Sequence, residues 1–138
     1  MTLTDRELAL VAAAVAARDQ AYAPYSHFKV GAAVALADGR VVTGVNVENV
    51  SFGLTVCAER NAVAAAVLAG ALPGTLALIA VAAQSDAPVP PCGACRQVLA
   101  EFAPPDVPVL LHNIATDTTV RRTVGDLLPE AFGKDRLP

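Results

Sequence analysis

The sequence has little positive charge and no long basic segment. Its 10 lysines and arginines are outnumbered by 13 aspartates and glutamates, which gives a formal net charge of −3. The longest basic run is the pair Arg121–Arg122, which we interpret as a solvated strand end. A protein that binds a nucleic acid polymer must neutralise many phosphates, so this composition argues against such a partner.

Cysteine and aromatic residues are also scarce. Three cysteines are an odd number and make a poor disulfide framework, so they favour thiolate chemistry or a metal site in a reducing compartment, and we expect a cytoplasmic protein. There is no tryptophan, whereas 29 residues are alanine. Small apolar side chains suit close helix packing, and we expect part of this apolar surface to lie between subunits.

No apolar run is long enough to cross a membrane without interruption. Residues 62–83 are uncharged, but the turn at residues 70–75, with the sequence GALPGT, divides them into two short pieces. The apolar run at residues 8–17 follows Asp5-Arg6-Glu7 and therefore lacks the net positive start of a signal peptide. We therefore expect no membrane partner.

Hydrophobic periodicity predicts a single α/β domain over residues 1–138. The sequence opens with an amphipathic helix, which Thr4 begins as N-cap in a capping box with Glu7. An Asp38-Gly39 turn indicates an antiparallel hairpin. The strand, helix and strand after residue 75 predict a parallel pair, so the sheet is mixed, with about five strands and helices on both faces. Helices are expected at about 5–21, 57–69 and 92–102, and strands at 29–36, 41–45, 76–83, 107–112 and 118–122.

The three thiols and one acid form a candidate metal centre. Cys92 and Cys95 lie on one face of a predicted helical turn, and Cys57 begins another helix, where the backbone N–H groups stabilise a thiolate. Three thiolates could converge on Zn²⁺, and three protein ligands leave the fourth position for water, as in catalytic zinc sites. Glu59 is placed to move protons beside it. A thioredoxin-like redox pair and a structural Cys₃His site with His27 or His112 are the alternatives.

Four motifs resemble the small homotetrameric zinc-dependent cytidine deaminases, over about residues 21–132. The Cys-Ala-Glu and Pro-Cys-Gly-Ala-Cys segments match the zinc deaminase signature, with Cys in place of His. The resemblance implies a three-layer α/β/α cytidine deaminase-like fold and hydrolysis of cytidine and deoxycytidine to the uridines, with release of ammonia. The motifs are YSHFKVGAA at 25–33, NVEN at 46–49, TVCAER at 55–60 and PCGACRQ at 91–97.

The resemblance also implies residue roles. One zinc ion per chain would be held by Cys57, Cys92 and Cys95, with Glu59 as the catalytic proton shuttle. A nucleoside would contact the positions Phe28, Asn46, Glu48 and Ala58, together with Phe132 from a neighbouring subunit of the homotetramer. Pro90 or Pro91 would complete the pocket. Because a carboxylate and an amide suit sugar hydroxyls and repel a phosphate, a nucleoside is favoured over a nucleotide.

The resemblance also bears on three further positions, Arg60, Gln97 and Phe52. Three thiolates leave zinc with a formal charge of −1, and Arg60 resembles the family's arginine that offsets it by bonding to the ligand sulfurs. Gln97 is expected to support the site from the next layer. Phe52 departs from the family, since many relatives have a tyrosine there. Blasticidin S deaminases share the zinc motifs and are the nearest alternative, but they fit the motifs at 28–31 and 46–49 less well.

Overall fold

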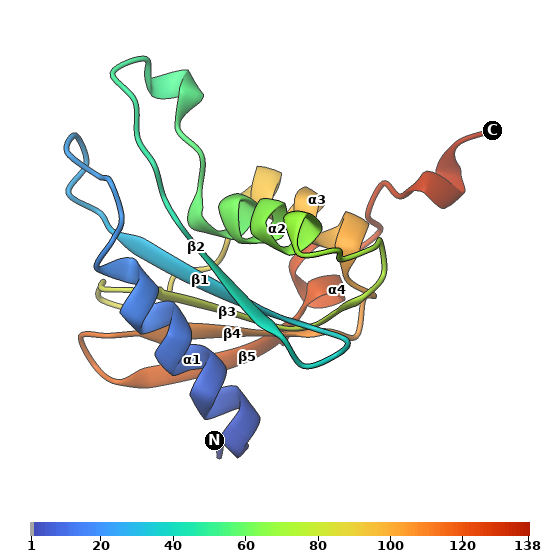
Figure 1. Cartoon of the computed structure of the whole chain (residues 1–138), viewed down its shortest axis with the longest axis horizontal. Coiled ribbons are helices and arrows are strands. Elements are labelled where there is room, and N and C mark those ends of the chain that lie inside the picture. Colours follow the sequence, from blue (N-terminus) through green and yellow to red (C-terminus); the bar gives the residue numbers. More distant parts are fainter. Residues whose placement is uncertain (1) are drawn as a thin grey trace.

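Apolar strands form a five-stranded mixed sheet at the centre of the computed structural model, which describes residues 2–138 (Figure 1). The strand order is β2-β1-β3-β4-β5, and only β3 and β4 are parallel among the paired strands. The predicted hairpin and the predicted parallel pair are both confirmed. The strands are β1 (Val30–Leu36), β2 (Val41–Val45), β3 (Leu76–Ala83), β4 (Pro108–Asn113) and β5 (Thr118–Thr123).

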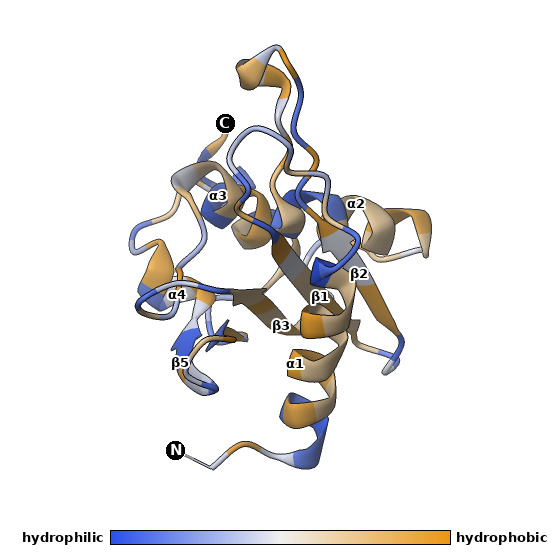
Figure 2. Cartoon of the chain, turned by 90° about the vertical axis from the view of Figure 1, so that its left-hand side faces the viewer, coloured by the Kyte–Doolittle hydropathy of each residue, from blue (hydrophilic) through white to orange (hydrophobic). Residues whose placement is uncertain are grey.

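Helices cover both faces of this sheet, which confirms the three-layer arrangement. Helix α1 (Asp5–Arg18) lies on one face, whereas α2 (Ala58–Leu68) and α3 (Gly93–Phe102) lie on the other (Figure 1). Two apolar clusters fill the spaces between the layers. Figure 2 shows hydrophobic colouring along β3 and along parts of α1, whereas β5 is largely hydrophilic. Strand β3 is buried on both faces because its alternate side chains enter the two clusters.

The first helix begins as predicted and ends earlier. Thr4 and Glu7 form the capping box, but the helix stops at Arg18 rather than near Ala21. The reason is a competing pairing, since the Tyr22 N–H donates to the Asn46 carbonyl at 3.0 Å and the Tyr22 carbonyl accepts from the Glu48 N–H. The segment between β2 and α2 also contains a short 3₁₀ helix, Phe52–Leu54, where the sequence indicated only a loop.

Arg121 is not the solvated strand end that the sequence suggested. Its guanidinium Nε donates to the Glu7 carboxylate at 3.0 Å, and that carboxylate belongs to a residue only 7 % exposed. The pair joins the start of α1 to β5 across 114 residues of sequence. Arg122, its neighbour, is exposed, as expected.

Gly44 positions the helix that follows the second strand. A Cβ at this residue would lie 2.3 Å from the Ala62 nitrogen and 2.6 Å from the Ala58 carbonyl oxygen of α2. Only glycine therefore allows β2 to lie so close to the first turns of α2. Asn61 adds a hydrogen bond from its Nδ2 to the Val45 carbonyl at 2.8 Å.

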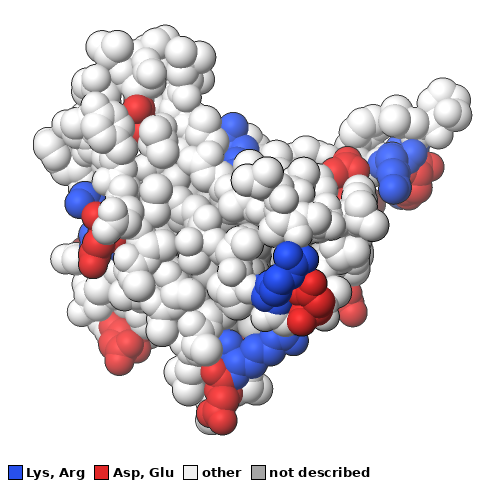
Figure 3. Space-filling view, in the orientation of Figure 1, with Lys and Arg blue, Asp and Glu red and all other residues white. Residues whose placement is uncertain are grey.

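On the face shown in Figure 3, the charged side chains are scattered and do not form a band of one sign. There, acidic and basic side chains lie next to one another and leave wide uncharged areas. Within residues 2–138, no helix combines the length and the hydropathy needed to span a bilayer. A short helix, α4 (Val124–Leu127), and a 3₁₀ turn, Lys134–Arg136, complete the described chain.

Candidate metal centre and active site

The three cysteines meet where two helices begin. Cys57 is the N-cap of α2 and Cys92 is the N-cap of α3, while Cys95 lies in the first turn of α3. Their sulfur atoms all lie within 4.8 Å of one another, and those of Cys57 and Cys92 are 3.8 Å apart. Among residues 2–138, no His, Asp or Glu belongs to the group. Three sulfur ligands suit Zn²⁺ and leave one of its four tetrahedral positions for water.

The thiols differ in their environment. Burial acts to raise the pKa of Cys92, but hydrogen bonds from the Cys95 backbone and from the two other thiols lower it overall. Burial, followed by the nearby charge of Glu59, raises the pKa of Cys95. A bound cation reverses such a penalty, because a coordinating thiol is deprotonated outright. The buried thiol of Cys95 and the exposed thiol of Cys92 can therefore both serve as thiolate ligands of one cation.

Arg60 contacts the cluster directly. Its Nη2 donates to the Cys57 sulfur at 3.5 Å, and this bond is the main cause that raises the pKa of the guanidinium. The Arg60 Nε atom is buried and has no hydrogen-bond partner. The guanidinium thus places a fixed positive charge beside the sulfur group. The expected position of Arg60 beside the sulfurs is thus observed.

Glu59 lies in the first turn of α2 and is only 5 % exposed. Burial raises the pKa of its carboxyl group, and the opposing influences of its own backbone and of Arg60 are smaller. A raised pKa suits a group that must both accept and release a proton near neutral pH. The Glu59 side chain shares a cavity with Cys57 and Cys92.

This cavity has a volume of about 200 Å³ and forms beside the metal centre. It brings together three of the predicted substrate contacts, Phe28, Asn46 and Ala58. Pro90, in the segment that leads into α3, also lines the cavity, as the family resemblance implied for Pro90 or Pro91, whereas its neighbour Val89 was missed by the sequence reasoning. The walls are largely apolar, so a flat ring could enter while its polar edge meets Glu59.

Asn46 and Glu48 are already engaged in the protein. Asn46 accepts from the Val30 N–H at 2.8 Å and donates to the Phe28 carbonyl at 2.7 Å. Glu48 accepts from the Tyr25 N–H at 2.9 Å and from the hydroxyl of Ser26, and the Ser26 hydroxyl is the main cause that lowers its pKa. Glu48 lines an adjoining cavity of about 240 Å³, which shares Thr55 with the first.

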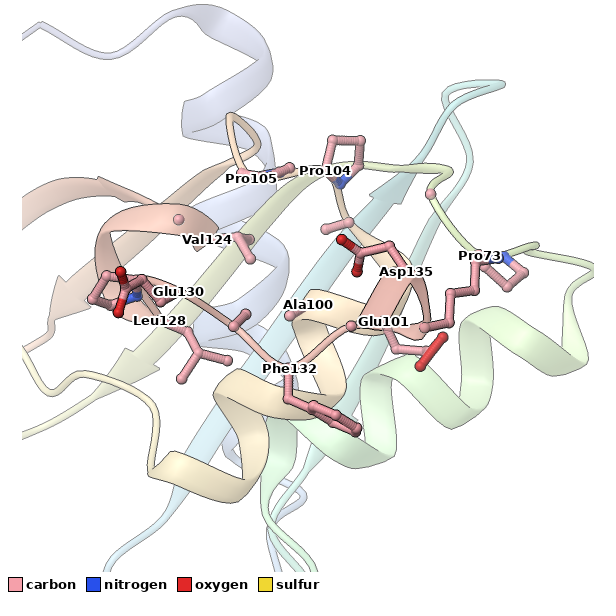
Figure 4. Close-up of a pocket in the computed structure, with 17 residues that line it drawn as sticks. Pro73, Ala100, Glu101, Pro104, Pro105, Val124, Leu128, Glu130, Phe132 and Asp135 are labelled. Atoms are coloured by element: carbon pink, nitrogen blue, oxygen red, sulfur yellow. The ribbon is translucent and has the colours of Figure 1, made fainter. Parts of the chain in front are cut away.

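Phe132 does not reach the cavity of its own chain. It lies on the C-terminal segment, is 63 % exposed, and lines a different cavity of about 450 Å³ between α3, α4 and this segment (Figure 4). The Gln97 side chain donates to the Phe132 carbonyl at 2.8 Å. Gln97 therefore supports the C-terminal segment through this bond.

The alternative metal ligands lie elsewhere. Neither His27 nor His112 belongs to the sulfur group in the described chain. His112 is buried at the end of β4 and bonds through Nδ1 to the Thr119 hydroxyl at 2.9 Å, as a satisfied strand residue. The structure thus contradicts a Cys₃His site.

Comparisons with known proteins agree with this geometry. A family model, the cytidine and deoxycytidylate deaminase zinc-binding region, matches residues 4–111. A cytidine deaminase of Halalkalibacterium halodurans is 50 % identical over 93 % of this chain and 94 % of its own. A cytidine deaminase of Mycobacterium tuberculosis is 50 % identical over 86 % of this chain and 83 % of its own. The crystal structure of cytidine deaminase from Burkholderia pseudomallei superposes with a TM-score of 0.88 at 52 % identity, covering 94 % and 100 % of the two chains.

Proposed function

Because the chain belongs to the cytidine and deoxycytidylate deaminase family, we propose that its cavity binds cytidine or deoxycytidine and that Cys57, Cys92 and Cys95 hold the ion that activates water there. The chain is an enzyme of zinc-dependent hydrolytic cytidine deamination, a reaction consistent with pyrimidine salvage. Water and cytidine are converted to uridine and ammonia. The observation that supports the assignment of roles is the meeting of three sulfurs and one buried carboxyl group at a single cavity.

Glu59 performs the proton transfers in this proposal. Zinc, when bound, supplies the Lewis acidity that makes water a nucleophile at neutral pH. A neutral aminopyrimidine is a poor electrophile, so Glu59 delivers a proton to ring atom N3 as C4 is attacked. The proton for N3 comes from the attacking water. The carboxylate then takes the remaining proton from the new C4 hydroxyl and gives it to the departing amine, because NH₂⁻ is a poor leaving group. Its burial in the cavity wall keeps bulk water from competing for these protons.

Recognition of the nucleoside uses the cavity walls and the adjoining cavity. Phe28 and Ala58 contact the base, and Asn46 and Glu48 hold the ribose hydroxyls. Glu48 exchanges its bond to the Ser26 hydroxyl for a sugar hydroxyl, which needs little movement because Ser26 is exposed and can bond to water. The negative charge of Glu48 disfavours a 5′-phosphate.

The active site is completed by a neighbouring subunit of a homotetramer in this proposal. The segment between β2 and α2 and the C-terminal segment both extend from the body of the molecule (Figure 1). They carry apolar side chains that one chain leaves exposed, including Phe52 at 73 % and Phe132 at 63 %. Burial of these side chains against other copies would place Phe132 beside a partner's cavity. The free thiols favour a cytoplasmic enzyme. In this proposal, residues 1–138 form a single domain.

Purified protein tests these assignments together. We expect about one zinc per chain and loss of the cytidine ultraviolet band as uridine forms. Deoxycytidine should react, whereas deoxycytidine monophosphate and blasticidin S should react poorly. A mass of four chains by light scattering supports the tetramer. Reversible disulfide formation with no zinc and no deamination would instead support a redox protein.

A further inference from the structure

The segment between β3 and α3 forms one wall of the cavity but has no backbone support of its own. It covers residues 84–91 and supplies Val89 and Pro90 to the wall. Within the described chain, no backbone-to-backbone hydrogen bond involves residues 84–91. Its course therefore depends on side chains from other elements.

Three prolines make the second half of this segment stiff. Residues 88, 90 and 91 are proline, so they restrict φ and cannot donate a backbone hydrogen bond. A stiff segment moves as one piece, and its direction is set by how its two ends are held. Small errors at either end would be carried to Val89 and Pro90.

Asn113 holds the first end. It is fully buried at the end of β4, beside the end of the parallel strand β3. Its Nδ2 donates to the Ser85 carbonyl at 2.8 Å, and its Oδ1 accepts from the Ser85 N–H at 3.2 Å and the Ala115 N–H at 3.1 Å. Both backbone groups of Ser85 are thus bonded to one buried amide, which fixes the direction of the chain as it leaves the sheet.

Arg96 holds the second end. Its Nε donates to the Pro91 carbonyl at 2.8 Å, next to the metal ligand Cys92. Its Nη1 donates to the Leu127 carbonyl at 2.8 Å, at the end of α4. One guanidinium therefore fixes the entry into α3 and ties that entry to the C-terminal part of the chain.

We propose that Asn113 and Arg96 are positioning residues for the deamination, which together hold the 84–91 segment as a fixed wall against the pyrimidine ring. The proposal rests on the proposed function, since it treats the cavity beside the cysteines as the substrate site. Neither side chain is among the residues that line the cavity. Each acts through the segment, and a misplacement of about 1 Å in a positioning element can cost about 100-fold in rate.

The opposite end of β3 provides a matched control. There the Thr75 hydroxyl accepts from the Leu72 N–H at 3.2 Å and donates to the Leu72 carbonyl at 2.6 Å. Thr75 thus holds both backbone groups of one residue, as Asn113 does, but at a turn that lines none of the cavity beside the cysteines. Thr75→Val removes these bonds and should leave the kinetics unchanged.

The test compares Asn113→Ala, the milder Asn113→Ser, Arg96→Met and Arg96→Lys with the Thr75→Val control. For Asn113→Ala and Arg96→Met, we expect KM for cytidine to rise about tenfold, with a smaller fall in kcat and a full zinc content. Hydrogen exchange should become faster at the Ser85 N–H in Asn113→Ala and at the first turn of α3 in Arg96→Met. Arg96→Lys should restore part of the loss, because an ammonium can still bond to one carbonyl.

The outcomes separate this proposal from the proposed function. A faster-exchanging segment with an unchanged KM would overturn the positioning role while the deaminase assignment stands. Unchanged exchange in both Asn113→Ser and Arg96→Met would also overturn it. If the wild-type protein fails to deaminate cytidine, the proposed function fails, whereas the exchange data still report whether the two side chains hold the segment. Should Asn113→Ala fail to fold, Asn113→Ser and Arg96→Met each decide the question from one end.

Discussion

Two glutamates lie in the first turns of two helices, and both are almost fully buried. Glu7 of α1 is 7 % exposed and Glu59 of α2 is 5 % exposed. Glu7 bonds to Arg121, which is the main cause that lowers its pKa. For Glu59, burial is the main cause and raises the pKa, while its own backbone, the Arg60 charge and the Cys95 thiol lower the pKa by less.

The difference shows how one residue type serves two purposes in one fold. A buried carboxylate that has an arginine and a capping bond holds its charge and links distant elements. A buried carboxyl group without an arginine bonded to it is less stable in its charged form, so it can accept and release a proton more readily. The sheet separates the two, since α1 covers one face and α2 covers the other.

The largest expected effect is on Glu59. Glu59→Gln should lower turnover by at least about 10³-fold, because the amide cannot carry a proton to N3 and then to the amine. The folded structure and the zinc content should remain, since Glu59 is not a ligand in this proposal. Steady-state kinetics together with metal analysis measure both. Loss of zinc from the variant would recast Glu59 as a ligand and break the comparison.

A smaller effect is expected at the neighbouring position. Arg60→Ala should lower turnover by about 10-fold to 100-fold while most of the zinc is kept, since the guanidinium offsets thiolate charge at Cys57. Arg60→Lys keeps a charge and should recover part of the activity. Full zinc with unchanged turnover in Arg60→Ala would refute this charge compensation.

The smallest effect on catalysis is expected at Glu7. Glu7→Gln should lower the midpoint of thermal unfolding at pH 7 by about 5 °C and leave kcat and KM for cytidine unchanged. Calorimetry and kinetics on the same preparation check this. A fall in activity comparable to that of Glu59→Gln would remove the distinction between the two carboxylates.

Acid should abolish the contribution of Glu7. Its folded pKa lies below the ordinary 4.5, so its stabilising effect is complete above pH 4.5 and is lost as the pH falls through the folded value. The difference in unfolding midpoint between the wild type and Glu7→Gln should therefore shrink below pH 4.5. A difference that stays constant down to pH 2 would show that the ion pair is not its cause.

Local signals predicted the metal centre better than the long-range contacts. Cys57 and Cys92 each stand directly before a helical pattern, so their placement at helix starts could be deduced from neighbouring residues. The partner of Glu7 is 114 residues away, and no periodicity links the two. The capping box was visible because its two residues are three positions apart.

The same contrast applies within the cavity. Phe28, Asn46 and Ala58 were predicted through family motifs, and they line the cavity together. Asn113 was missed, because an asparagine at the end of a strand is an ordinary turn residue until its burial is known. Glu48 was predicted to meet the sugar, but its bonds to Tyr25 and Ser26 depend on how two loops meet in space.

The metal centre draws its sulfurs from the beginnings of two different helices, α2 and α3. One ion bound to Cys57, Cys92 and Cys95 would connect these two helices on one side of the sheet. Chelation should loosen that side alone, so that hydrogen exchange quickens at the start of α2 and α3 while α1 keeps its protection. Holding the ion and holding the two helices together are then the same event.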